Sequence, residues 1–217
     1  MILESKEKKH HWEVHMIQMS DHPVSVHYRN ICKPSWESRG LDVKLFEAIT
    51  PKDLSILKDL HFTRIYSIGS GLEGRDFTDT ELAIWGSHYA LWKQCAEQNN
   101  PYIIIEHDAL LMKPLPFEKM KHWNVVLCLG YTYLKGNGPV GSKWPCGAYT
   151  LHPAKAKILV NHVRGCIIKA NSDAYIQKFT TVDDKYFSAV QLYHADMGNT
   201  IRHGNKEPDI TFYQPTR

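Results

Sequence analysis

Apolar and polar stretches alternate along the 217 residues in the order expected of an α/β protein. The stretch 14–19 and the alternating stretch 43–46 are typical of strands, and residues 102–105 have the sequence Tyr-Ile-Ile-Ile without a polar position. A strand with no polar side is covered on both faces, so residues 102–105 are predicted to form a central strand. Three more strands are predicted at residues 125–129, 147–151 and 190–193, and the last is expected to close the sheet. The predicted fold is α/β, with a mixed central sheet flanked by helices.

Helix boundaries are marked by prolines, glycines and capping residues. Pro23 is predicted to open a helix, and Gly40 is predicted to cap its end. Thr78 and Glu81 have the capping-box spacing, and the helix that they open is expected to reach about residue 98. Its apolar residues form two adjacent stripes, which predicts a helix that is largely buried. Further helices are expected to begin at residues 50–53 and at residue 153, the second running to about residue 164.

Composition and charge restrict the class of protein. Hydrophobic residues make up 43% of the chain and charged residues 23%, which excludes an intrinsically disordered protein. The net charge of +3, with 13 histidines, permits a polyanionic partner without requiring one. The five cysteines include no Cys-x-x-Cys pair, so we expect reduced thiols. We expect one domain at residues 13–217 after a flexible tail at residues 1–12.

The sequence also bears on localisation. The N-terminal stretch has basic residues but lacks the apolar core of a signal peptide. No stretch approaches the roughly 18 apolar residues that a membrane span requires. We therefore predict a cytoplasmic protein without a membrane span.

Two carboxylates directly follow the predicted central strand: Glu106 and Asp108. Open α/β sheets bind ligands outside the carboxyl ends of their strands, and neighbouring carboxylates form a hard oxygen site suited to Mg²⁺ or Mn²⁺. Such an ion can bridge a sugar diphosphate and neutralise the charge that develops on the leaving group. The alternative is structural, with Glu106 ending the strand and Asp108 opening a turn.

The sequence around this strand end has a recognisable pattern. Residues 87–92 are Ser-His-Tyr-Ala-Leu-Trp, and residues 101–111 are Pro-Tyr-Ile-Ile-Ile-Glu-His-Asp-Ala-Leu-Leu. Together they resemble glycosyltransferase family 25, which includes lipooligosaccharide and collagen galactosyltransferases. Weaker similarity extends from residue 14 to about residue 173, with Phe-Glu-Ala at 46–48 and Gly-Ala-Tyr at 147–149. The resemblance implies a single Rossmann-like domain of the GT-A type. It also implies transfer of a sugar from a nucleotide-sugar with inversion at the anomeric carbon. The implied donor is a uridine diphosphate sugar, and the implied cofactor is Mn²⁺ or Mg²⁺.

The resemblance also implies roles for residues near the strand end. Glu106 and Asp108 would bind the metal ion, and Asp108 belongs to the catalytic residues. His107 stands where the family has the middle acid of a Glu-Asp-Asp motif, and imidazole is itself a competent ligand for Mn²⁺. His88 becomes a candidate for the donor site, whereas without the resemblance it would be interpreted as a hydrogen-bonded core histidine.

Residues at both ends of the chain complete the expected site. Asp21 and Arg29 follow the first strand, where this chain departs from the family's opening segment, and are assigned to the donor nucleotide. His203, in a His-Gly-Asn sequence, resembles a histidine that completes the metal site in the glycosyltransferase domain of collagen lysyl hydroxylases. His194 is the competing ligand.

Inverting transfer needs a general base for the acceptor hydroxyl. Asp173 matches a family aspartate that follows the Gly-Ala-Tyr strand and its helix, and Asp183 and Asp184 are the alternatives. Trp144 lies in a long glycine-rich loop, where it is expected either to close over a sugar or a base or to anchor the loop.

The acceptor is left open between two kinds of molecule. Family precedent favours a saccharide or a hydroxylated side chain, whereas a compact basic enzyme also suits a hydroxymethylated base in viral DNA. The alternative function is a catalytically inactive nucleotide- or sugar-binding module of the same fold, because His107 replaces a family acid.

Overall fold

A computed structural model describes residues 12–64, 74–120, 126–131, 147–181 and 189–192. Its main sheet has four strands in the order β2-β1-β4-β8. Their bounds are Val43–Glu47 for β2, Glu13–Gln18 for β1, Tyr102–Glu106 for β4 and Ala148–Leu151 for β8. The first three are parallel, and β8 runs antiparallel to β4. The fold is thus mixed α/β and Rossmann-like, as predicted from the sequence.

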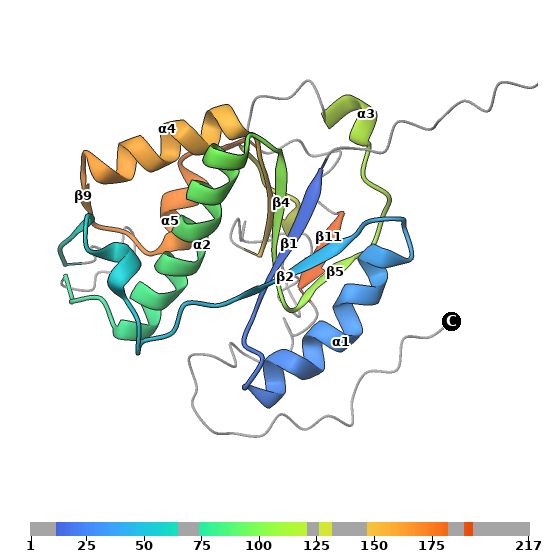
Figure 1. The fold of residues 1–217 in the computed structure, drawn as a ribbon, viewed down its shortest axis with the longest axis horizontal. Helices are drawn as coiled ribbons and strands as arrows, with labels where there is room; N and C mark the ends of the chain where they lie inside the picture. Colours follow the sequence, from blue (N-terminus) through green and yellow to red (C-terminus); the bar gives the residue numbers. More distant parts are fainter. Residues whose placement is uncertain (1–11, 65–73, 121–125, 132–146, 182–188, 193–217) are drawn as a thin grey trace, which may run out of the picture.

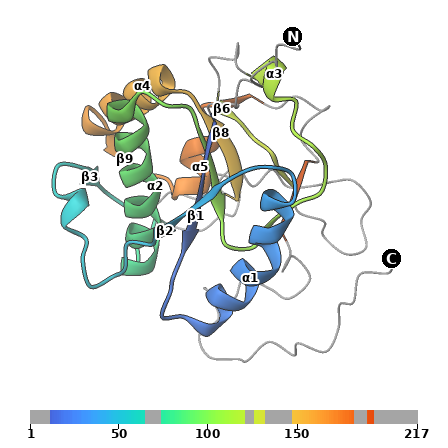
Figure 2. The ribbon, with the colours of Figure 1, turned by 45° about the vertical axis from the view of Figure 1, so that its right-hand side comes forward.

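Helices cover both faces of this sheet (Figure 1). Helix α1 (Pro23–Glu37) packs Cys32 and Trp36 on one face, together with Ile103 and Ile105 of β4. Helix α2 (Asp79–Gln98) and helix α4 (Pro153–Arg164) cover the other face, where Ile104 is buried among aromatic residues. In the turned view of Figure 2, α1 again lies across the sheet from α2 and α4. Because successive side chains of a strand point to opposite faces, β4 serves two hydrophobic cores.

The remaining elements are short. Two of them precede β4 in the chain: η1 (Ser55–Leu57) and β3 (His61–Phe62). The others follow β4: the helices α3 (Phe117–Met120) and α5 (Ser172–Gln177), and the strands β5 (Ala109–Leu111), β6 (Val126–Leu127), β7 (Gly130–Tyr131), β9 (Ile167–Ile168), β10 (Thr180–Thr181) and β11 (Val190–Leu192). Within the described residues, the short strands form three small sheets, β5-β11-β7, β10-β6 and β3-β9.

Two sequence predictions for secondary structure are wrong. The helix expected from residues 50–53 is absent, and the segment forms only the 3₁₀ turn η1. Asp53 accepts a hydrogen bond from the Ser55 N–H at 3.1 Å, which offers the backbone an alternative to a helix. The strand expected to close the main sheet, β11, pairs instead with β5 and β7, and β8 is the edge strand next to β4. The predicted strand at 125–129 is shortened to β6, and residue 125 lies outside the described residues.

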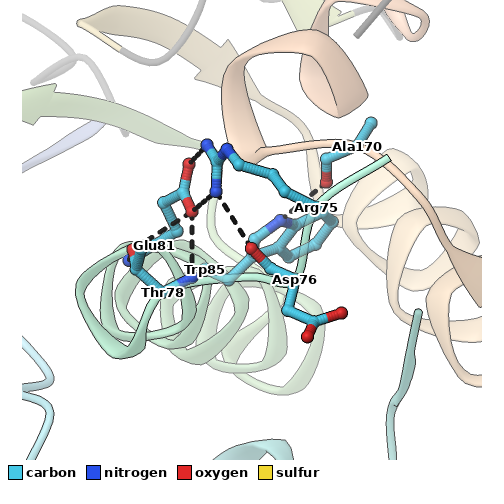
Figure 3. Close-up of polar contacts among 6 residues, drawn as sticks. All are labelled: Arg75, Asp76, Thr78, Glu81, Trp85 and Ala170. Atoms are coloured by element: carbon cyan, nitrogen blue, oxygen red, sulfur yellow. Dashed lines mark hydrogen bonds and ion pairs between the residues drawn. The ribbon is translucent and has the colours of Figure 1, made fainter. Parts of the chain in front are cut away.

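The start of α2 confirms the predicted capping box. Thr78 Oγ1 accepts from the Glu81 N–H at 3.2 Å, and the Glu81 carboxylate accepts from the Thr78 N–H at 3.0 Å. Arg75 adds two hydrogen bonds to Glu81, at 2.8 and 2.7 Å, and the arrangement is shown in Figure 3. The hydrogen bond from Arg75, opposed by burial and assisted by Thr78, lowers the pKa of Glu81 to about 2. One turn later, Trp85 donates to the Ala170 carbonyl at 3.0 Å, which fixes α2 against the segment before α5.

The capping box predicts a measurable contribution to stability. Thr78→Ala removes the acceptor for the Glu81 N–H and should lower the free energy of unfolding by about 1 kcal/mol. Thr80→Ala is the matched control, because Thr80 is exposed in the same helical turn and alanine is the better helix former. Urea unfolding of both variants measures the difference. Equal losses in the two variants would contradict the capping role.

Candidate functional site at the carboxyl edge of the sheet

The carboxyl ends of β1 and β4 lie at a switch point of the sheet. From β1 the chain passes through α1 on one face to β2, and it then returns through α2 on the other face to β4 on the far side of β1. In open α/β sheets, ligands bind at such a point, outside the carboxyl ends of the strands. Here the strands end in Gln18 and Glu106, and Glu106 is the register neighbour of Ile17.

A polar network connects β1 to β2 at this edge. Arg29 of α1 donates to the Gln18 side-chain oxygen at 2.6 Å, and the Gln18 amide donates to Glu47 at 2.9 Å. The Glu47 carboxylate also accepts from the Ser20 N–H at 2.7 Å. Gln18 is buried, whereas Glu47 is exposed. The network therefore fixes the loop after β1 and leaves a guanidinium and a carboxylate beside it.

Glu106 belongs to a second network, which extends into the α2 core. Its Oε1 lies 3.8 Å from His88 Nε2. The other ring nitrogen of His88 is 2.9 Å from the Tyr149 hydroxyl, and Trp92 donates its indole N–H to the same oxygen at 2.8 Å. The Glu106 side chain is 31% exposed, while that of His88 is 1% exposed. Glu106 therefore lies between a buried hydrogen-bonded chain and the carboxyl edge.

Asp108 and His107 lie toward α1 instead. They form the turn between β4 and β5, and the Trp36 indole of α1 donates to the next carbonyl, that of Ala109, at 2.8 Å. Asp108 is 1% exposed. The pKa of the Cys32 thiol in α1 is raised by the burial of that thiol and by the negative charge of Asp108. His107 is 8% exposed, with its ring centroid 6.2 Å from that of Tyr28 in α1. The carboxylates of Glu106 and Asp108 thus have different surroundings.

The side chains available as metal ligands determine whether a divalent ion fits here. Within the described ranges, no group of three or more His, Cys, Asp and Glu side chains is arranged to hold an ion. Mg²⁺ is usually held by one or two carboxylates together with substrate phosphates. The partly exposed Glu106 fits an ion that arrives with a diphosphate, whereas Asp108 is buried toward α1.

The other expected site residues are distributed unevenly. Asp21 is exposed in the turn between β1 and α1, near Arg29 in sequence. Asp173 lies in α5, but its side chain is outside the described part. Several candidates lie wholly outside the described residues: Trp144, Asp183, Asp184, His194 and His203.

Three residues of the two networks were not singled out from the sequence. Gln18 and Glu47 end neighbouring parallel strands, and the strand-end rule that identified Glu106 would also have identified them. Tyr149 lies in the interior of β8, and no local signal marks its hydroxyl as the partner of two side chains of α2. Only the tertiary fold brings it there.

The mixed sheet with helices on both faces defines an α/β protein with a Rossmann-like fold. A family model, glycosyltransferase family 25 (LPS biosynthesis protein), matches residues 16–125, just over half of the chain. The chain therefore belongs to glycosyltransferase family 25 and is a glycosyltransferase. A search of curated protein sequences gave no significant match. In the described ranges, none of the helices has both the length and the apolar character needed to traverse a membrane.

The matched residues contain much of the site. They include the end of β1 and the whole of α1, β2, α2 and β4, and hence both strand-end networks except Tyr149. The resemblance stated from residues 87–92 and 101–111 is thereby confirmed at the level of the family.

The shared hydroxyl of Tyr149 yields a prediction for stability. Tyr149→Phe leaves the buried Trp92 N–H and a ring nitrogen of His88 without this oxygen, so the free energy of unfolding should fall by about 1–3 kcal/mol. The control is Tyr175→Phe, because the Tyr175 hydroxyl contacts the exposed His162, which water can solvate. Denaturant unfolding should give the larger loss for Tyr149→Phe. A loss no larger than that of the control would contradict the buried network.

Proposed function

We propose that this glycosyltransferase takes its sugar from a nucleotide-sugar that binds at the carboxyl edge of β1 and β4. The observation that supports the proposal is the position of Glu106 at the switch point, where it is the partly exposed end of a buried network. The parallel strands β2, β1 and β4 beside the antiparallel β8 suit a GT-A-type fold. The donor that we propose is a uridine diphosphate sugar.

The residues around β1 suit the nucleotide part of the donor. Arg29 carries a guanidinium at the edge, which favours an anionic diphosphate. Asp21 is exposed in the loop that follows β1 and is available to the polar groups of a nucleoside. The hydrogen bonds among Gln18, Glu47 and Ser20 keep this loop in place.

We assign Glu106 and Asp108 to a divalent ion, Mn²⁺ or Mg²⁺, with His203 as a further ligand. When bound, the ion neutralises the charge that develops on the leaving diphosphate. Glu106 contributes an accessible carboxylate, and Asp108 contributes a buried negative charge beside the turn. His107, in the same turn, is a further candidate ligand.

The chemistry requires a base on the acceptor side of the donor. We assign this role to Asp173, with Asp183 and Asp184 as alternatives. A carboxylate that takes the hydroxyl proton as oxygen attacks the anomeric carbon from the side opposite the diphosphate gives inversion.

Replacing Glu106 provides the principal test. Glu106→Gln keeps the shape but removes the charge, and it should lower the metal-dependent release of free nucleotide from the donor about 100–1,000-fold. Asp108→Asn should have an effect in the same range. Glu97→Gln is the matched control, because Glu97 is exposed near the C-terminal end of α2, outside the proposed site. A screen of nucleotide-sugars, with Mn²⁺, with Mg²⁺ and with a chelator, measures the rates.

The screen tests the position of the site, the metal requirement and catalytic activity separately. Undiminished activity of Glu106→Gln would place the site elsewhere. Activity that a chelator leaves unchanged would contradict the metal requirement. Binding of uridine diphosphate by calorimetry without turnover of any donor would favour the inactive binding module.

The acceptor hydroxyl that we propose belongs either to a saccharide or to a hydroxymethylated base in DNA. The net charge of +3 is the property that favours DNA. If DNA is the acceptor, its binding should weaken steeply as salt increases, because phosphate contacts release counterions. Gel shifts of hydroxymethylated and unmodified duplexes in increasing salt measure this. If neither duplex binds even at low salt, DNA is excluded and the saccharide is the proposed acceptor.

A further inference from the structure

His88 is buried between two partners that lie on opposite sides of its ring. Its Nδ1 is 2.9 Å from the hydroxyl of Tyr149, and its Nε2 is 3.8 Å from Oε1 of Glu106. With an exposure of 1%, the side chain is shielded from any ligand at the edge of the sheet. Glu106 is thus the partly exposed neighbour through which a buried His88 could act on a ligand at this edge.

The chemistry of the two partners favours one arrangement of protons. A carboxylate only accepts hydrogen bonds, so a proton on Nε2 is favoured on the side that faces Glu106. On the other side, the indole of Trp92 can only donate, and it occupies an acceptor position of the Tyr149 oxygen. The Tyr149 hydroxyl is then well placed to donate its own hydrogen to Nδ1. Both partners favour the same tautomer, in which the Nε2–H faces Glu106.

The separation between His88 and Glu106 leaves room for a closer contact. A separation of 3.8 Å is an ion-pair distance but exceeds that of a hydrogen bond. Catalytic hydrogen bonds are often long in the free enzyme and tighten when the substrate binds. Glu106 is partly exposed and has room to move, whereas His88 is fixed by its packing and by Tyr149.

We propose that His88 is the positioning residue of Glu106. Trp92 and Tyr149 hold the ring so that its Nε2–H faces the carboxylate, and the hydrogen bond that forms when Glu106 moves closer sets which Glu106 oxygen faces the donor. The inference rests on the proposed function of Glu106. It assigns the Ser-His segment of α2 to orienting an acid, in place of contacting the nucleotide.

Two substitutions at position 88 separate this role from a purely structural one. His88→Gln extends an amide as far as Nε2 and keeps a donor toward Glu106, whereas His88→Asn reaches only as far as Nδ1 and keeps the contact with Tyr149. His88→Asn should lower kcat/KM about 10–100-fold, mainly through kcat, because partners of this kind typically change activity by that amount. His88→Gln should be at least tenfold more active than His88→Asn. Thermal unfolding of both variants accompanies the rate measurements.

The reverse order of activities would overturn the proposal. If His88 serves only to bond Tyr149, then His88→Asn should be at least as active as His88→Gln, and activity should follow thermal stability. A loss that appears only in KM, with kcat unchanged, would also contradict the orienting role.

A measurement without substrate keeps this inference distinct from the proposed function. Nitrogen-15 NMR of the imidazole, assigned by comparison with His88→Gln, reports which ring nitrogen of His88 carries a proton. We expect a protonated Nε2 in the wild type and a higher fraction of protonated Nδ1 in Tyr149→Phe. An unprotonated Nε2 in the wild type would overturn the inference. If no nucleotide-sugar is turned over but Nε2 is protonated, the proposed function fails while the coupling of His88 to Glu106 stands.

Discussion

The site depends on the complete burial of β4. Between Tyr102 and Ile105 every side chain is fully covered, alternately by the α2 face and by the α1 face. A polar group in such a strand would lose its water without a replacement, at a cost of several kcal/mol. Apart from the Tyr102 hydroxyl, which donates to the Gln98 side chain at 2.7 Å, polar side chains begin where the strand ends, at Glu106. The same constraint applies less strictly to β1 and β2, which end in Gln18 and Glu47.

The burial of β4 also makes its carboxyl end rigid. Glu106 is held by strand pairing on both sides, since β1 lies on one side and the Glu106 N–H bonds the Gly147 carbonyl on the other, at 3.0 Å. Strand pairing fixes the backbone of Glu106, while its partly exposed side chain keeps room to move. In the proposed role of His88, its ring would orient this side chain, and a site for a highly charged ligand requires such support.

Much of this arrangement could be predicted from the sequence, because it follows from local patterns. The uninterrupted apolar residues 102–105 predicted the central strand, and the spacing of Thr78 and Glu81 predicted the start of α2. The positions of Asp108 and Tyr149 could not be predicted in this way. Residues i and i+2 share a face only while the chain remains extended. The chain turns after Glu106, so the spacing of the two acids did not determine their surroundings.

What turns the chain at this point is a contact far away in sequence. The buried Trp36 indole requires an acceptor, which it finds in the Ala109 carbonyl, and the Ser35 hydroxyl accepts from the Leu111 N–H at 2.9 Å. These two bonds hold β5 against α1 and draw the intervening turn toward the α1 face. No pattern within residues 106–111 encodes them.

The turn also gives a physical reason for histidine at position 107. The side chain is 8% exposed near Tyr28 and lies between Glu106 and the buried Asp108 in sequence. A carboxylate at this position would have to be buried as well, and desolvation opposes that. Imidazole can be buried in its neutral form, and it keeps a nitrogen that can bind a metal ion. Histidine is therefore easier to bury in this turn than an acid would be, and its imidazole remains a candidate metal ligand.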